Sequence, residues 1–462
     1  MSLRMGKVAA AATALLVGLF LVPEWAEAET RQVVFSKDAP PERHDSLIIG
    51  ANIHYGTGLV YGYTSRDIAI DAIRDLGGNS FRDYFLWPAF RFDEEKRARL
   101  NPGSARRLFD LLAHSDLMPL LNVGYPTPHV PGGVPPVSDE ALVYFRNYLT
   151  EAVRIMEPYR PMYEIWNEWN ISANDGKPRR RLVGEGDPAD PRAAVHYVRI
   201  AKTALATIHA ADPDAKVLVG GVGDDLDDWA WTKAIVRGGV LDGAAGLSIH
   251  LYNHCMKPAN RNARELIRRA EVLQDELKAM RGGAETPIYV TEVGWPTGGT
   301  TSCPVSEQVQ AQNYAQFVLM AASVPWIRGI WMHSLKDVGP SPTDTEHHFG
   351  LFTYLDNAPK PGVCYFREAV DLVRQAESIE IKEPFSDVFV AMIRGKAGRK
   401  LVLWASSDAV SASYRLGAGA KNGRLICGAT TVIPEAQPGQ IVPQPIVFDL
   451  AGDEPVEIDI MR

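Results

Sequence analysis

The chain has 462 residues, of which 46% are hydrophobic and 23% are charged, so it is long enough to form a large hydrophobic core. Its formal net charge of -8 argues against a nucleic-acid partner and against binding to an anionic membrane surface. Composition and charge do not identify a substrate.

The N-terminal residues 1–28 have the features of a secretory signal peptide. Arg4 and Lys7 form a positively charged region, and Val8 to Val22 is apolar. A small-x-small cleavage site follows at residues 26–28. The apolar stretch is shorter than the ~20 residues that span a bilayer. We therefore expect a periplasmic or secreted protein that begins near Glu29 and has no membrane span after cleavage.

From residue 46 to residue 376, short apolar runs alternate with segments that carry helix start and stop signals. Eight units of this spacing predict a (β/α)8 TIM barrel of the α/β class. A doubly wound open sheet is the alternative, but no Gly-rich phosphate loop follows the first run. The predicted strands are Leu47–Asn52, Asn79–Tyr84, Pro119–Val123, Met162–Trp166, Lys216–Gly221, Gly246–Tyr252, Pro287–Val293 and Ile327–His333. The predicted helices include Asn101–His114, Ser138–Met156, Pro191–Ala211, Asp227–Arg237, Ala263–Arg281, Glu307–Ser323 and Gly362–Ala376.

The segment 377–462 is different, because its apolar runs are short, rich in β-forming residues and separated by turn residues. This pattern predicts a small C-terminal antiparallel domain that resembles a β-sandwich. The N-terminal segment 29–45 contains one further run, Gln32 to Phe35, which we expect to pair with a strand of this domain.

The four cysteines allow three connectivities, and the sequence alone does not choose between them. Cys255 and Cys303 follow the sixth and seventh predicted strands, so their loops are neighbours on one face of a barrel. We therefore predict a Cys255–Cys303 disulfide, and a second one between Cys364 and Cys427 that joins the two domains.

Two of the predicted strands end with a glutamate. Glu292 lies in the segment PIYVTEVGWPT (287–297), and Glu168 lies in PMYEIWNEWN (161–170). A structural salt bridge would be the better explanation for one such residue alone. Two carboxylates at the C-terminal ends of barrel strands face each other across the mouth of the barrel. Glycoside hydrolysis requires such a pair, with one carboxyl to protonate the leaving oxygen and one to attack the anomeric carbon.

Other strand ends carry polar donors and tryptophans, which together suit a sugar. Hydroxyl groups need hydrogen bonds, and the C–H faces of a sugar stack on aromatic rings. Packing in the core is the alternative for any single tryptophan. The predicted substrate-binding residues are Arg82, Asn167, His250, Tyr252, Trp87, Trp169, Trp295 and Trp331.

These residues resemble clan A of the retaining glycoside hydrolases over residues 46–376. In that clan an Asn-Glu pair after strand four supplies the acid/base, and a Glu after strand seven is the nucleophile. The resemblance assigns these roles to Asn167-Glu168 and to Glu292. It also matches the clan's strand-two arginine, its strand-six pair and its strand-eight tryptophan to Arg82, His250, Tyr252 and Trp331.

Within the clan the chain is most similar to family 39, in particular to exopolysaccharide hydrolases of the PslG type. The similarity rests on YEIWNEWN, on EHHFGLF (346–352) with Lys360-Pro361 after it, and on the small C-terminal domain. Trp169 departs from the family, which usually has Asn-Glu-Pro there. Family 17, the β-1,3-glucan hydrolases, is the alternative because TEVGWPT resembles their nucleophile segment.

The resemblance implies that Arg82 and Tyr252 hold Glu292 in its ionised form, and that Asn167 binds the sugar 2-OH. It implies no cofactor. The histidines near Cys255 and at positions 347 and 348 lack the spacing of a metal site. Arg179 to Arg181 belong either to a solvated loop or to an anion subsite.

The predicted function is a retaining, monomeric glycoside hydrolase that cuts inside an extracellular or periplasmic polysaccharide, such as the exopolysaccharide of a biofilm matrix. The endo mode is predicted because the tryptophans, with Tyr125 and the loop 126–136, are spread around the barrel rim. An exo-glycosidase, a non-catalytic polysaccharide-binding barrel and a metal-dependent barrel hydrolase remain as alternatives.

Overall fold

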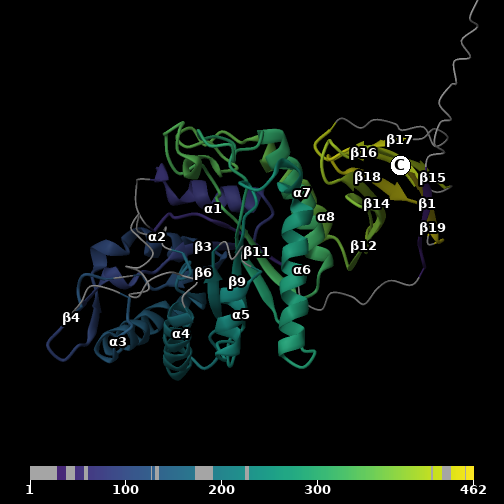
Figure 1. Ribbon diagram of the computed structural model, residues 1–462. Coiled ribbons are helices and arrows are strands. Elements are labelled where there is room, and N and C mark those ends of the chain that lie inside the picture. The colour runs from purple at the N-terminus through teal and green to yellow at the C-terminus, as the bar shows by residue number, and fades with distance from the viewer. Residues whose placement is uncertain are drawn as a thin grey trace, which may run out of the picture.

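The computed structural model describes residues 29–37, 47–56, 61–125, 127–130, 135–171, 191–223, 228–417, 420–428, 439–452 and 454–462. The predicted signal peptide and Arg179 to Arg181 lie outside these ranges, as do residues 126 and 131–134 of the loop 126–136. The described chain forms a barrel and, beside its helices α7 and α8, a smaller unit of strands (Figure 1).

Within the described residues, eight parallel strands close into a barrel, which confirms the predicted (β/α)8 fold. Their order around the barrel is β10-β11-β2-β3-β6-β7-β8-β9, so each strand pairs with its neighbour in the chain and the last pairs with the first. Every one of these strands is largely buried, as parallel strands covered by helices must be. The strands are β2 (Ile48–Asn52), β3 (Ser80–Tyr84), β6 (Met118–Val123), β7 (Met162–Ile165), β8 (Val217–Val222), β9 (Gly246–Leu251), β10 (Ile288–Val293) and β11 (Ile327–Met332).

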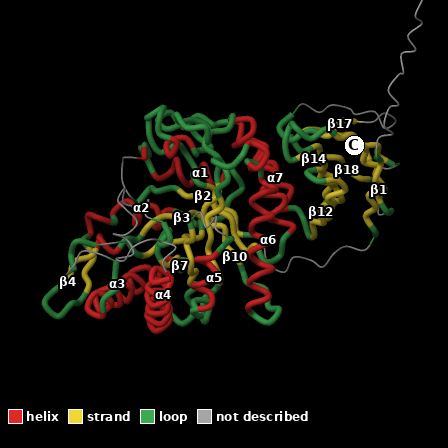
Figure 2. The backbone as a smooth tube through the Cα atoms, viewed as in Figure 1, coloured by secondary structure: helices red, strands yellow, loops and turns green. Residues whose placement is uncertain are grey.

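Helices surround this barrel (Figure 2). Several begin at a residue whose side chain accepts a hydrogen bond from a free backbone N–H group, as Ser138, Asn262 and Ser306 do. The helices are α1 (Arg66–Asp75), α2 (Arg106–His114), α3 (Asp139–Met156), α4 (Pro191–Ala211), α5 (Ala230–Arg237), α6 (Ala263–Met280), α7 (Glu307–Ser323) and α8 (Pro361–Arg374).

The main difference from the predicted elements lies between β3 and α2. A hairpin of β4 (Phe90–Phe92) and β5 (Ala98–Leu100) stands there and was not predicted. The predicted helix from Asn101 instead begins with the short 3-10 turn η3 (Pro102–Ser104). Because the Asn101 side chain accepts a hydrogen bond from the N–H of Gly103, it caps this turn rather than the α-helix.

The strands of the smaller unit form two antiparallel sheets. One has the order β1-β19-β15-β17 and the other β12-β13-β14-β18-β16, and a separate apolar core contains side chains of both. The N-terminal strand β1 pairs with β19, so the two ends of the described chain meet in this unit. The strands are β1 (Thr30–Phe35), β12 (Ser378–Phe385), β13 (Val388–Gly395), β14 (Gly398–Ala405), β15 (Ala412–Leu416), β16 (Ala420–Leu425), β17 (Gly439–Ile441), β18 (Ile446–Leu450) and β19 (Val456–Met461).

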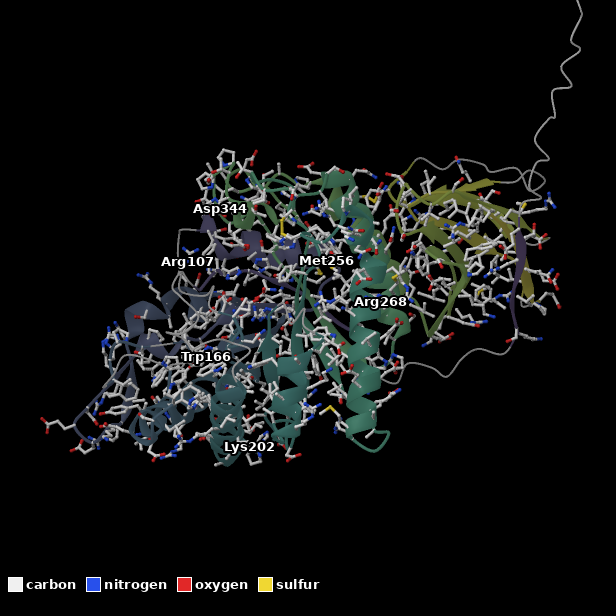
Figure 3. All side chains as sticks on the ribbon, in the orientation of Figure 1. Arg107, Trp166, Lys202, Met256, Arg268 and Asp344 are labelled. Carbon is white, nitrogen blue, oxygen red and sulfur yellow. A yellow bond between two sulfur atoms is a disulfide. The ribbon has the colours of Figure 1, made fainter. Side chains whose placement is uncertain are left out.

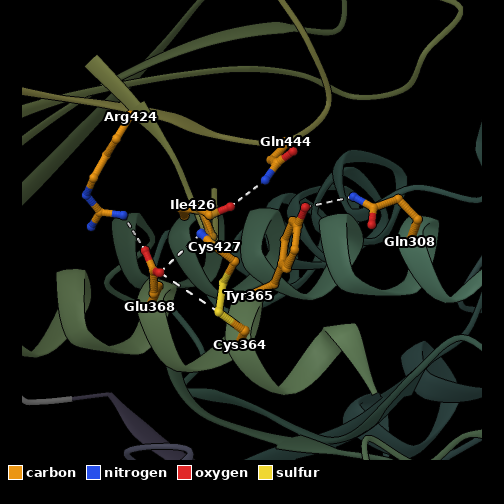
Figure 4. Close-up of a disulfide and its surroundings, with 8 residues drawn as sticks. All are labelled: Gln308, Cys364, Tyr365, Glu368, Arg424, Ile426, Cys427 and Gln444. Carbon is orange, nitrogen blue, oxygen red and sulfur yellow. Dashed lines mark hydrogen bonds and ion pairs between the residues drawn. A yellow bond between two sulfur atoms is a disulfide. The ribbon is translucent and has the colours of Figure 1, made fainter. Parts of the chain in front are cut away.

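A disulfide between Cys364 and Cys427 joins α8 to the smaller unit, as predicted (Figure 4). Beside it, Arg424 forms an ion pair with Glu368 (Nη1 to Oε2, 2.5 Å), and the Cys427 N–H donates to the same carboxylate. Gln316 of α7 adds two hydrogen bonds to backbone carbonyls of the smaller unit. A cross-link of this loop length typically stabilises a fold by about 2–4 kcal/mol.

The second disulfide, Cys255–Cys303, joins the loops after β9 and β10, again as predicted. Its Cα atoms are 4.3 Å apart. It therefore braces the face of the barrel at which the strands end. Among the described residues, no helix has the length and the apolar composition needed to cross a membrane.

Candidate active site

The two glutamates predicted from the sequence lie together at the C-terminal ends of the barrel strands. Glu168 follows β7, and Glu292 lies near the end of β10. One carboxylate oxygen of each lies within 4.8 Å of the other. Their side chains are 14% and 7% exposed, so the pair is reachable from the barrel mouth but shielded from bulk water. The structure thus brings together the two glutamates in the kind of pair that glycoside hydrolysis uses.

An irregularity in β10 turns Glu292 towards the site. Tyr289 faces the barrel interior, where it packs with Trp331, and strict alternation would point Thr291 the same way. The register of β10 against β9 shifts between Val290 and Glu292. Such bulges redirect a side chain and are frequent next to active sites. With strict alternation, Glu292 would point away from the barrel interior. The shift therefore explains why its carboxylate reaches the buried arginine of β3.

Arg82 is the centre of the charged cluster. Its guanidinium is fully buried and donates to Glu292 (Nη1 to Oε1, 2.8 Å) and to Glu164 (Nε to Oε2, 2.7 Å). It also donates to the side-chain oxygens of Asn52 (2.6 Å) and Asn167 (2.7 Å). Since a buried guanidinium is costly without partners, all four contacts stabilise its position. Arg82 therefore links the nucleophile candidate to the residue that precedes the acid/base candidate.

Glu292 is held in its ionised form. Burial by itself raises the pKa of this carboxyl group, but His250, His333 and Arg82 lower it. The Tyr252 hydroxyl donates to Oε2 at 2.7 Å and lowers the pKa further. The net result is a pKa well below the ordinary value for glutamate. An ionised carboxylate is the form that a nucleophile needs.

Glu168 is paired with a histidine instead of an arginine. His250 is fully buried, and its Nδ1 lies 2.8 Å from Oε1 of Glu168. Burial lowers the pKa of His250, but Glu292 and the hydrogen bond to Glu168 raise it, and the net direction is upward. The same Nδ1 atom is farther from Glu292, at 3.5 Å from Oε2, so His250 forms its hydrogen bond with Glu168 rather than with Glu292. This asymmetry separates the roles of the two glutamates.

Strained backbone gathers at the same place. Four non-glycine residues at the strand ends have a left-handed backbone, namely His54 (φ 53°), Tyr125 (φ 69°), Trp166 (φ 65°) and Glu168 (φ 48°). Such conformations persist only where the surroundings hold them, and they cluster at functional sites. These residues lie at the C-terminal ends of β2, β6 and β7. The strained backbone therefore lies on the same face of the barrel as the two glutamates.

Tyrosines and histidines form the aromatic surface beside the carboxylates. His54 stacks between Tyr61 and Tyr84, with ring centroids 5.0 and 5.3 Å away, and meets the edge of His333 at 5.7 Å. Tyr84 in turn contacts the edge of Tyr125 at 5.7 Å. Burial, and next His333, lower the pKa of His54 to about 3. His54, Tyr84 and Tyr125 form a neutral aromatic wall. Tyr125 was predicted to line a substrate groove, whereas His54 and Tyr84 were not among the predicted substrate-binding residues, although they too stand at strand ends.

The four tryptophans that were predicted to bind substrate are fully buried, and this prediction needs correction. Their rings pack on protein and present no face to a ligand. Three of the four use the indole N–H inside the core. Trp169 donates to the Ala193 carbonyl, Trp295 to Asn253 and Trp331 to Ser80, whereas Trp87 packs on Phe145 and Tyr148 of α3.

Trp331 shows that an apolar side chain at the end of a strand need not face the substrate site. It belongs to a layer inside the barrel, with Leu120, Met162, Leu218 and Tyr289, below the charged cluster. Trp166, labelled in Figure 3, is also a core residue, at 1% exposure. The open groove that was predicted from exposed tryptophans therefore has no support from these rings.

Glu164 was not predicted from the sequence. This residue lies in β7 between Tyr163 and Ile165, and its side chain is fully buried against Arg82. The available signal was a charged residue inside an otherwise apolar strand, which is costly unless the charge is paired or used. Asn52 and Asn122 likewise enter the cluster from strand ends, and Asn122 donates to Glu164 at 3.0 Å.

Glu168, His250 and Glu292 are also the described residues that come nearest to a metal-binding arrangement in the barrel. Each offers one ligand atom, and these atoms lie within 4.8 Å of one another. However, Arg82 already places a cation 2.8 Å from Glu292, and the Nδ1 atom of His250 is taken by Glu168. A metal ion would have to compete with both contacts, so the arrangement suits proton transfer better.

No protein-family model matches the sequence, and no curated protein matches it. The fold is similar to that of a family 39 glycoside hydrolase from the gut symbiont Bacteroides cellulosilyticus WH2 (TM-score 0.63, 17% identity, 88% of this chain and 81% of that chain). It is similar to a monomeric beta-xylosidase from Caulobacter crescentus CB15 (TM-score 0.54, 13% identity, 92% and 97%). It is also similar to GH5_18 from Streptomyces cattleya in complex with GlcNAc (TM-score 0.54, 19% identity, 71% and 81%). At these identities the likeness shows the fold alone.

Proposed function

We propose that the protein is a retaining glycoside hydrolase in which Glu292 is the nucleophile and Glu168 is the acid/base. One observation carries the proposal. Two carboxylates lie within 4.8 Å at the barrel mouth, and their partners differ, since Arg82 and Tyr252 hold one while His250 holds the other. Carboxylates this close leave no room for the water that an inverting enzyme places between them.

In the first step, Glu168 donates its proton to the glycosidic oxygen while Glu292 attacks the anomeric carbon. The bond to the leaving group breaks, and a covalent glycosyl ester of Glu292 forms. Arg82 and Tyr252 orient the attacking carboxylate through separate oxygens, Oε1 and Oε2. The aromatic wall of His54, Tyr84 and Tyr125 supports the sugar ring beside it.

In the second step, Glu168 is ionised and accepts a proton from water, which attacks the anomeric carbon and releases Glu292. His250 remains within hydrogen-bond distance of Glu168 throughout, so it stabilises the carboxylate between the two steps. Because Asn167 uses its side-chain oxygen to bind Arg82, its NH2 group is the part that remains for the sugar 2-OH. No cofactor enters either step.

The proposed substrate is an extracellular or periplasmic polysaccharide, such as the exopolysaccharide of a biofilm matrix, and the proposed location of the monomeric enzyme is the periplasm or the exterior. The predicted signal peptide supports both. The similarity to PslG-type hydrolases belongs to this proposal, as does endo cleavage. An exo-glycosidase is the second candidate, because the tryptophans expected to line a groove are buried. The similar folds include one described as a beta-xylosidase.

A panel of aryl glycosides and polysaccharides tests the proposal, with sizing of the products over time. We expect hydrolysis by the wild type and none by the Glu292→Gln variant. Early oligosaccharides with a fall in viscosity would support endo cleavage, and monosaccharide from the start would support the exo alternative. Binding of a polysaccharide without hydrolysis of any glycoside would favour a non-catalytic barrel and contradict the proposal.

A further inference from the structure

Glu164 is a charged residue that neither step of the proposed reaction uses. Its carboxylate is fully buried, and Oε2 accepts hydrogen bonds from Arg82 (Nε, 2.7 Å) and from Asn122 (3.0 Å). Burial raises the pKa of Glu164, but Arg82 and then His250 outweigh it, so the pKa lies below the ordinary value. The cluster thus contains a second buried anion, bound to the same guanidinium as the proposed nucleophile.

The number of anions around Arg82 calls for an explanation. Glu292 already pairs with the guanidinium at 2.8 Å, so one counter-ion is present without Glu164. Burying an additional carboxylate costs several kcal/mol of desolvation, which its contacts only partly offset. An ordinary structural ion pair needs one anion for each cation. Here one guanidinium is shared by two carboxylates, at 2.6 and 2.8 Å.

The two carboxylates differ in what happens to them during the proposed reaction. Glu292 loses its charge when it becomes a glycosyl ester, and it regains the charge when the ester is hydrolysed. Glu164 lies below the site, on the inner face of β7, and keeps its charge in both states. Without it, Arg82 would become an unpaired buried cation each time the ester forms, which is strongly unfavourable.

We propose that Glu164 is a positioning residue, the permanent counter-ion that holds Arg82 in place while Glu292 alternates between carboxylate and ester. The role of Glu164 in the reaction rests on the proposed function. The underlying physical statement, that either carboxylate alone suffices to hold Arg82, concerns the folded protein and can be tested without any substrate.

A double-mutant cycle of unfolding free energy provides the test. Glu292→Gln removes the charge that the ester would remove, and Glu164→Gln removes the permanent one with nearly the same shape. We expect each single variant to fold. The double variant should have an unfolding equilibrium constant at least about tenfold larger than the two single effects predict together, as for residues in one network.

Two controls accompany the cycle. Glu164→Asp retains the charge, so its combination with Glu292→Gln should be close to additive. Glu368→Gln removes a carboxylate that binds Arg424 instead of Arg82, and its combination with Glu292→Gln should also be additive. Additivity of the Glu164→Gln and Glu292→Gln pair would overturn the inference. So would a Glu164→Gln single variant that does not fold, because Glu292 should then hold Arg82 alone.

Kinetics of Glu164→Gln with an activated aryl glycoside give the second readout. The proposal predicts a larger loss, about tenfold or more, in formation of the glycosyl ester than in its hydrolysis, since only the first step leaves Arg82 unpaired. Equal losses in both steps would contradict it. If the wild type hydrolyses no glycoside, the proposed function fails, while the unfolding cycle still reports on Glu164.

Discussion

The charged cluster and the tryptophans at the strand ends were predicted to bind substrate by the same rule, yet the structure treats them in opposite ways. Arg82, His250 and Tyr252 converge on the two glutamates. The four tryptophans turn into the core. A strand-end position is therefore informative for a charged side chain and nearly uninformative for an indole.

The reason for the difference is energetic. Burying a guanidinium or a carboxylate is unfavourable unless it gains partners, so a buried charge marks a place where partners were assembled. A tryptophan buries about 150–250 Å² of largely apolar surface and is stabilised wherever it packs. At about 25 cal/mol per Å², that burial contributes several kcal/mol with no ligand present.

The largest expected effect comes from the charged cluster. Glu292→Ala should lower kcat/KM by about 10⁴-fold or more, because the covalent step loses its nucleophile. Added azide should restore turnover by attacking the anomeric carbon directly. Measurement on an aryl glycoside, with Trp295→Phe, three residues further along the chain, as the control, checks this. A loss below tenfold would remove Glu292 from the chemistry.

Arg82→Lys is the next largest change. A lysine keeps the charge but cannot make the four side-chain contacts that Arg82 makes, so the carboxylate of Glu292 loses its orientation. We expect a loss of about 10²-fold in kcat/KM, the usual effect of removing one preorganised donor. Activity within threefold of the wild type, with an unchanged melting temperature, would show that the guanidinium fork is not needed.

The sequence predicted the barrel from its spacing, and the meeting of Glu168 with Glu292 and the Cys255–Cys303 disulfide followed from that barrel. Eight βα spacings define the barrel, and a glutamate at a strand end defines each site position. Glu164 was missed because it lies within a strand, where an apolar neighbour on each side hides it. His54 and Tyr84 of the aromatic wall were missed because their position beside the carboxylates depends on side-chain packing, which strand periodicity does not encode.

Substitution of the buried tryptophans should lower stability more than activity, the opposite of what we expect for the charged cluster. Trp87→Phe and Trp295→Phe should each lower the free energy of unfolding by about 1–3 kcal/mol, since a smaller ring leaves space in a packed core. Their kcat/KM on a small aryl glycoside should remain within about threefold of the wild type. Chemical denaturation and kinetics on the same samples measure both. A large activity loss at unchanged stability would restore these residues as part of the substrate site.

A further expected effect concerns the pH dependence of stability and His54. Its pKa is about 3 in the fold, compared with 6.5 for the unperturbed residue. Between these values the unfolded chain binds a proton that the folded protein does not, so stability falls as the pH is lowered from 6.5 towards 3. The slope is about 1.4 kcal/mol per pH unit. Glu292 adds a loss in the same direction below its ordinary pKa, and His250 contributes stability that is lost as the pH rises through its raised pKa.

Denaturation of the wild type and of His54→Phe between pH 3 and pH 7 measures this contribution. The variant should show the shallower slope over the interval, because the contribution of Glu292 is common to both proteins. Parallel curves would mean that folding does not lower the pKa of His54, and the neutral aromatic wall beside the carboxylates would be wrong.

The anomeric configuration of the first product tests the central claim most directly. Proton NMR spectra recorded within the first minutes of hydrolysis, before mutarotation, distinguish the two anomers. Because a carboxylate oxygen of Glu168 and one of Glu292 lie within 4.8 Å, the account predicts a product with the same configuration as the substrate. A first product with the opposite configuration would show that water attacks the sugar directly, and Glu292 would not be the nucleophile.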